Sequence, residues 1–129
     1  MSATPRVLAL VPDLCDFAAL AESLVAAGIQ TERTESLLGA CLHQVSEPAG
    51  LVLCDADAVD WREVLLVLRR LKRSSPVVFL TRLADERLWL DMLEAGAFDL
   101  VAKPYRPCDL RWVAITALKK HVAVRASAA

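Results

Sequence analysis

The residues best placed for chemistry lie directly after three short apolar runs. Asp55 follows the run LVLC, Thr81 follows VVFL, and Lys103 follows LVA. Apolar runs of this length are typical of strands buried on both faces of a parallel sheet, and such sheets bind ligands at the carboxyl ends of their strands. A carboxylate, a hydroxyl and an ammonium group gathered there could hold a small charged ligand. Alternatively, Asp55 and Lys103 form an ion pair with each other, and Thr81 is a β-branched strand end whose hydroxyl bonds to the backbone.

Other catalytic and metal-binding patterns are missing from the sequence. It contains no glycine-rich phosphate loop and no Ser/His/Asp set, and His43 and His121 stand alone. The cysteines have neither CxxC nor Cys/His ligand spacing and are expected to be reduced: Cys15, Cys41, Cys54 and Cys108. Nothing near Cys54 in the sequence would lower its pKa, so we expect a small buried side chain there. Because no nucleophile has a base beside it, we do not expect an enzyme.

Strands and helices alternate along the predicted chain, and this alternation positions the polar residues. We expect strands at 6–11, 29–34, 51–54, 77–80 and 100–102, and helices at 17–25, 37–45, 64–71, 84–95 and 109–121. The short connections require right-handed βαβ units, which predicts an α/β fold with a doubly wound parallel sheet and helices on both faces. We expect one domain over residues 1–129, with an ordered core at about 5–121, a last helix capped by Asp109, and a tail or linker at 122–129.

Charge and hydropathy exclude several classes of protein. Fifteen basic and sixteen acidic residues give a net charge of -1, which offers no electrostatic footprint for nucleic acid or an anionic membrane. Charge-free stretches such as 36–46 fall short of the ~18 to 20 apolar residues that span a bilayer. The N-terminus before the first apolar run is too short and too polar for a signal peptide. We therefore expect a cytoplasmic protein that contacts neither nucleic acid nor membrane directly.

The three strand-end residues sit in segments that resemble the receiver domains of bacterial response regulators. The segments LVLCD, VVFLTR and EAGAFDLVAKP follow one another in the order of that family, and the resemblance covers nearly the whole chain. It implies a five-stranded, flavodoxin-like sheet of order 2-1-3-4-5. It also implies that Asp55 is the phosphoacceptor and that Thr81 and Lys103 bind the phosphoryl oxygens.

The sequence departs from this family at the residues that would bind a metal ion. Aligning Gly28 with the family's helix-ending glycine puts Val11 and Pro12 where receivers have an acidic pair. Magnesium prefers carboxylate and phosphate oxygens, so the remaining candidate ligands are Asp13, Asp55 and Asp57, and we expect Mg²⁺ to bind weakly. No other cofactor is indicated. The family's aromatic switch residue in the fifth strand is replaced by Leu100.

Two predicted helices carry large apolar residues outside their inward-facing stripes. In the helix at 84–95 the inward stripe is formed by Leu88, Met92 and Ala95, and in the last helix it is formed by Val113, Ala114 and Ala117. The outward residues predict a partner surface: Trp89, Leu93, Trp112 and Ile115. A wide buried face in a crowded small domain is the alternative. If the surface is real, it predicts a homodimer through the fourth and last helices.

These observations leave three hypotheses for function. The first is a receiver-like module of a two-component or phosphorelay system that acts by protein interaction, with phosphorylation of Asp55 impaired or absent. Its partner would be a histidine kinase or a downstream regulator. The second is a genuine receiver that a histidine kinase phosphorylates at Asp55. The third, from a different class, is a flavodoxin-like domain that binds a small ligand at the same strand ends.

Overall fold

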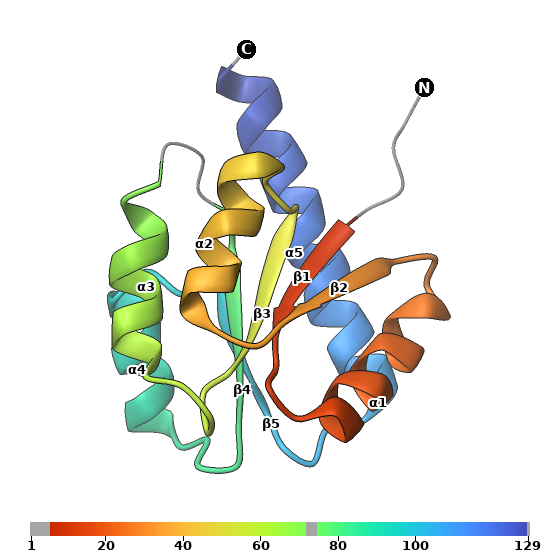
Figure 1. Ribbon diagram of the computed structural model, residues 1–129. Coiled ribbons are helices and arrows are strands. Elements are labelled where there is room, and N and C mark those ends of the chain that lie inside the picture. Colours follow the sequence, from red (N-terminus) through yellow and green to blue (C-terminus); the bar gives the residue numbers. More distant parts are fainter. Residues whose placement is uncertain (1–5, 72–74, 129) are drawn as a thin grey trace.

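Five parallel strands form one sheet in the order β2-β1-β3-β4-β5 (Figure 1). The computed structural model describes residues 6–71 and 75–128, with side chains as far as Lys120. The strands are β1 (Arg6–Leu10), β2 (Gln30–Thr34), β3 (Leu51–Asp55), β4 (Val77–Thr81) and β5 (Asp99–Ala102). The helices are α1 (Leu14–Val25), α2 (Leu37–Ser46), α3 (Trp61–Arg69), α4 (Glu86–Glu94) and α5 (Pro107–Ala128). The predicted fold class and strand order are confirmed.

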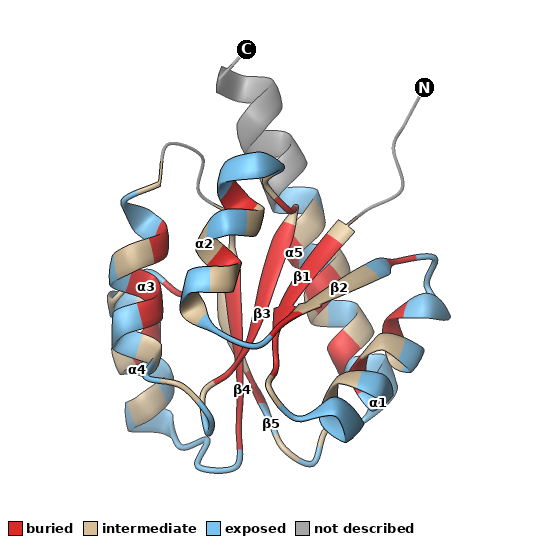
Figure 2. Ribbon diagram, viewed as in Figure 1, coloured by how far each residue is buried: buried red, intermediate tan, exposed pale blue. Residues whose placement is uncertain are grey.

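The apolar strands are buried because helices cover both faces of the sheet (Figure 2). Alternate residues of β1 show the division. Val7 and Ala9 pack with residues of α1 and α5, whereas Leu8 and Leu10 pack with residues of α2, α3 and α4. The central strands β3 and β4 are buried along their whole length, while the polar strand β2 lies at an edge, as predicted.

The helix ends differ from the expected ones where polar residues cap them. Asp13 accepts a hydrogen bond from the Asp16 amide, so α1 begins at Leu14 and not at 17. The last helix begins at Pro107, which places Asp109 in its first turn; the prediction that Asp109 is the cap is wrong. Proline suits a first helical position because it has no amide hydrogen to leave unpaired. The helix continues to Ala128, beyond the expected end near 121.

The buried face of α2 is not its most apolar face. Leu38, Leu42 and Val45 are 70%, 61% and 71% exposed, whereas Ala40 and Gln44 are buried. The Gln44 amide is satisfied inside, since its oxygen accepts from the Ala49 amide at 2.8 Å and its nitrogen donates to a serine hydroxyl at 2.9 Å. A stripe chosen by hydrophobicity alone therefore selects the wrong side of this helix.

Two glycines end helices. Gly28 after α1 and Gly96 after α4 have φ angles of 73° and 109°, a conformation that other residues rarely adopt. Within residues 6–71 and 75–128, no helix combines the length and the apolar character needed to cross a membrane.

Candidate functional site

The parallel register of β3, β4 and β5 brings the predicted polar residues to one edge of the sheet. Asp55 pairs with Leu80, the residue before Thr81, and Thr81 pairs with Ala102, the residue before Lys103. The Lys103 amide also donates to the Thr81 carbonyl at 2.9 Å, which continues the ladder past the end of β5. Three residues that are far apart in sequence are therefore neighbours at the carboxyl ends of their strands.

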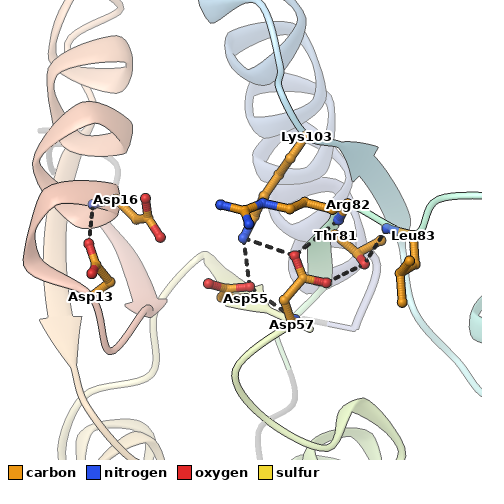
Figure 3. Close-up of polar contacts among 8 residues, drawn as sticks. All are labelled: Asp13, Asp16, Asp55, Asp57, Thr81, Arg82, Leu83 and Lys103. Carbon is orange, nitrogen blue, oxygen red and sulfur yellow. Dashed lines mark hydrogen bonds and ion pairs between the residues drawn. The ribbon is translucent and has the colours of Figure 1, made fainter.

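The ion pair predicted between Asp55 and Lys103 is present (Figure 3). The Lys103 Nζ lies 2.8 Å from Oδ1 of Asp55, whose side chain is only 7% exposed. The same ammonium lies 3.3 Å from Oδ2 of Asp57. One lysine is thus shared by two carboxylates, so the predicted pair has Asp57 as a further member.

Asp57 is the residue whose role was missed. Its Oδ1 accepts a 2.6 Å hydrogen bond from Oγ1 of Thr81, and its Oδ2 accepts from the Arg82 amide at 3.0 Å. Its own amide donates to Oδ1 of Asp55 at 3.0 Å. The Thr81 hydroxyl in turn accepts from the Leu83 amide at 3.1 Å. Asp57 therefore ties the loop after β3 to the loop after β4, a contact that its place two residues after a strand-end aspartate could have suggested.

The hydrogen bonds to Asp57 and Lys103 favour their charged forms. Burial by itself would raise the pKa of Asp57, but the hydrogen bonds from Thr81, Arg82 and Lys103 outweigh it and hold that pKa below its ordinary value. Burial would likewise lower the pKa of Lys103, yet the two aspartates raise it above the ordinary lysine value. Asp57 and Lys103 are therefore both held in their charged forms.

The end of β1 has a different character. Val11 is buried, and its carbonyl oxygen accepts from Nε of Arg33 at 3.1 Å. The Pro12 carbonyl accepts from Nη2 of the same arginine at 2.7 Å. Asp13 is occupied as the cap of α1, and Figure 3 shows it apart from the cluster around Asp55. Of the candidate metal ligands, the structure brings Asp55 and Asp57 together and leaves Asp13 elsewhere.

Cys54, beside Asp55, is buried and points into the opposite layer of the core. Burial raises the pKa of its thiol well above the ordinary cysteine value, and the charge of Asp55 raises it further. A thiol held in its neutral form is a poor nucleophile, which agrees with the prediction of a small buried side chain.

A cavity of about 510 Å³ lies beside this cluster, toward α1. Its walls are formed by residues of α1 and of the carboxyl ends of the strands: Val11, Asp16, Ala19, Leu20, Asp55, Leu80, Arg82, Lys103, Pro104 and Tyr105. Neither Asp16 nor Tyr105 could be assigned to this edge from the sequence, because neither follows a strand directly.

The predicted partner-surface residues differ in exposure. Trp112 is 71% exposed and Trp89 is 41% exposed, with the Trp89 indole donating to Oδ1 of Asp99 at 3.2 Å. Leu93 is half-buried. Ile115 is half-buried and packs partly against the core formed with α1, so it is less exposed than Trp112. The two helices flank the edge strand β5 from opposite faces of the sheet.

No protein-family model and no curated protein sequence matches the chain. Solved structures do match it. NtrX from Brucella abortus has a TM-score of 0.84 and 20% identity over 98% of the chain, which spans 29% of NtrX. A response regulator from Thermotoga maritima has a TM-score of 0.82 and 21% identity, covering 91% of this chain and 99% of that one. The receiver domain of the Francisella response regulator 1452 has a TM-score of 0.81 and 20% identity, covering 90% of this chain and 98% of that one. The chain has the fold of response-regulator receiver domains.

Proposed function

We propose that this protein is a receiver-like signalling domain of a two-component or phosphorelay system, which acts through protein contacts and not through efficient phosphorylation of Asp55. The fold supports the first part, since the similar structures are those of response regulators and receiver domains. The proposal of inefficient phosphorylation rests on one observation. The Arg33 guanidinium donates hydrogen bonds to the backbone carbonyl oxygens of Val11 and Pro12.

This arrangement does not fit a magnesium ion. Phosphoryl transfer relies on metal ions to neutralise oxygen charge, and Mg²⁺ requires several oxygen ligands in near-octahedral geometry. At the end of β1 the two available carbonyl oxygens face an arginine, which would repel the ion. Within the described part of the chain, no group of three or more acidic, cysteine or histidine side chains is arranged to hold a metal.

The contacts of Lys103 also argue against efficient phosphorylation of Asp55. The Lys103 ammonium is already bound by two carboxylates, and the Thr81 hydroxyl donates to Asp57. A phosphoryl group on Asp55 would have to break these contacts before it gained any. Leu100, half-buried against the core, also offers no aromatic ring to report such a change.

Incubation with acetyl phosphate and Mg²⁺, read by intact mass, tests the proposal. We expect the wild-type protein to remain largely unmodified and Mg²⁺ to bind no tighter than about a millimolar in calorimetric titration. The matched variant is Val11→Asp/Pro12→Asp, which returns two carboxylates to the end of β1 and is expected to gain a phosphoryl group.

A wild-type protein that takes up one phosphoryl group, and loses it on Asp55→Asn, would overturn the proposal. It would favour the second hypothesis, a genuine receiver. That hypothesis has the buried Asp55 and Thr81 and the half-buried Lys103 in its favour, because all three lie at the strand ends that the resemblance assigns to them.

The partner of this module is proposed to be a protein bound at the surface of α4, β5 and α5, and the simplest partner is a second copy of the chain. Trp112 is its best anchor, because exposed aromatic residues often dominate binding energy. A histidine kinase or a downstream regulator remains the expected partner in signalling.

A further inference from the structure

The cavity beside Asp55 has mostly apolar walls. Val11, Leu20 and Leu80 form its apolar part, together with Ala19 and the ring of Tyr105. Val11 stands where the resemblance to receivers would place a carboxylate, so a wall that would be charged is apolar in this chain. The volume of the cavity, about 510 Å³, lies within the range of roughly 300 to 1,000 Å³ that is usual for small-molecule sites.

Two opposite charges face each other across this cavity without meeting. Figure 3 shows the Asp16 carboxylate on α1 and the Arg82 guanidinium after β4 directed toward the space between them. Neither side chain forms an ion pair or a side-chain hydrogen bond with any residue of the described part of the chain. Lys103, the other cation of the cavity, is by contrast neutralised by Asp55 and Asp57.

A second carboxylate oxygen adds to the unmatched polarity on the acidic side. Oδ1 of Asp55 accepts from Lys103 and from the Asp57 amide, whereas its Oδ2 has no hydrogen-bond partner among the residues described. The residue is only 5% exposed and lines the cavity. Oδ2 is not among the buried side-chain atoms that lack a partner, so a donor in the cavity can reach it and form a charge-assisted hydrogen bond.

The charge of Asp16 contributes to the raised pKa of Tyr105, another residue that lines the cavity. The pKa of the Tyr105 hydroxyl lies above the ordinary tyrosine value, first because of burial and then because of the charge of Asp16, with Lys103 opposing. Tyr105 therefore stays protonated and can donate a hydrogen bond to an occupant.

A metal ion does not satisfy these features, because one wall is apolar and the acids are too few. A simple anion would meet Asp16 and Asp55, and a simple amine would leave Arg82 unpaired. We propose that the cavity binds a small zwitterion, an α-amino acid or a close analogue, with its ammonium group at Asp16 and Asp55, its carboxylate at Arg82, and an apolar side chain against Val11, Leu20 and Leu80. The inference rests on the part of the proposed function in which no metal ion occupies this edge.

Three probes with the same phenyl ring separate the two charged ends. L-Phenylalanine carries both charges, 2-phenylethylamine has only the ammonium group, and 3-phenylpropionate has only the carboxylate. Calorimetric titration of the 129-residue chain at neutral pH is expected to give a Kd of about a millimolar for L-phenylalanine. Each single-charge probe is expected to bind about five- to ten-fold more weakly.

Two variants assign the ends. Asp16→Asn is expected to weaken L-phenylalanine and 2-phenylethylamine about five-fold and to leave 3-phenylpropionate unweakened. Arg82→Gln is expected to weaken L-phenylalanine and 3-phenylpropionate and to spare 2-phenylethylamine. Glu22→Gln, which removes a charge from the same helix α1 outside the cavity, is the matched control and should change nothing. Ala19→Trp, which fills the cavity from α1, should abolish binding of all three.

Equal binding of the three probes, no binding of L-phenylalanine, or an unchanged affinity in Asp16→Asn and Arg82→Gln would each overturn the inference. These outcomes are separate from the phosphodonor experiment. A protein that fails to bind the zwitterion and remains unmodified keeps the proposed function, whereas one that is phosphorylated at Asp55 loses it whatever the titration gives.

Discussion

Lys103 is the residue on which the charged cluster depends. It is the cation shared by Asp55 and Asp57, and its own side chain is 17% exposed. Removing it leaves two neighbouring carboxylates without a counter-ion, one of them buried. Removing Asp55 still leaves Lys103 with Asp57. Loss of Lys103 should therefore destabilise the protein more than loss of Asp55.

We expect Lys103→Met to lower the free energy of unfolding by about 3 kcal/mol, because stranding a buried charge is costly. Asp55→Asn should lower it by less, about 1 to 2 kcal/mol, since the remaining ion pair survives. Urea unfolding measures both, with the exposed Lys119→Met as the control. A variant Asp55→Asn that is more stable than wild type would contradict the view that this pair is a structural one.

Acid should weaken the contribution of Asp57. Its pKa in the folded protein lies below the ordinary 3.8, so its charged form stabilises the fold above that pH, and the benefit is lost as the pH falls through the folded value. The difference in unfolding free energy between wild type and Asp57→Asn should then shrink as the pH is lowered from about 5 to about 2. Urea unfolding at several pH values tests this. A difference that stays constant over that range would show that the hydrogen bonds to Asp57 do not depend on its charge.

At the scale of elements, the contact between β2 and α2 depends on a missing side chain. A Cβ atom added to Gly39 would lie 2.2 Å from Oγ1 of Thr34, too close for two atoms that are not bonded. Thr34 is itself buried at the end of β2. Glycine at this place lets the first turn of α2 approach the strand.

Gly39→Ala should therefore destabilise the protein by about 1 to 2 kcal/mol, although the same change within a helix usually stabilises by roughly 1 kcal/mol. Thr34→Ala should remove most of this cost in the double variant, because the clashing oxygen is gone. Thermal unfolding of the two single variants and the double variant measures the coupling free energy between the substitutions at Gly39 and Thr34. Independent effects of the two substitutions would mean that the helix shifts to accept the methyl group.

At the scale of the whole molecule, the exposed tryptophan on α5 predicts self-association. Burying apolar surface is worth roughly 25 cal/mol per Å², so a shared patch with Trp112 at its centre favours a dimer. The half-buried Ile115 contributes less than its sequence suggested. Light scattering should show a dimer for wild type and a monomer for Trp112→Glu.

Leu42→Glu is the matched control for this experiment, since Leu42 is 61% exposed but lies on α2, outside the proposed surface of α4, β5 and α5. The Leu42→Glu variant should dimerise like the wild-type protein. A wild-type protein that is monomeric at high concentration would exclude the homodimer. A dimer disrupted by Leu42→Glu and not by Trp112→Glu would move the interface to α2.

The order of strands and helices, and the meeting of Asp55, Thr81 and Lys103 at one edge of the sheet, could be predicted from the sequence. Apolar runs and helical spacing report local burial, and in a parallel sheet each strand's carboxyl end must lie at the same edge. Asp55, Thr81 and Lys103 could therefore be brought together without coordinates. Their family-like segments added the strand order.

Only the tertiary structure decided how those side chains are paired and which helix faces are buried. Asp57 joined the cluster, and Arg33 reached Val11 and Pro12, through contacts between loops and strands whose distance depends on the exact packing. On α2, the buried Gln44 is stabilised by hydrogen bonds to partners elsewhere in the chain, which hydrophobicity does not encode. Asp16 and Arg82 line one cavity because α1 packs beside the carboxyl ends of the strands, and no spacing in the sequence records that approach.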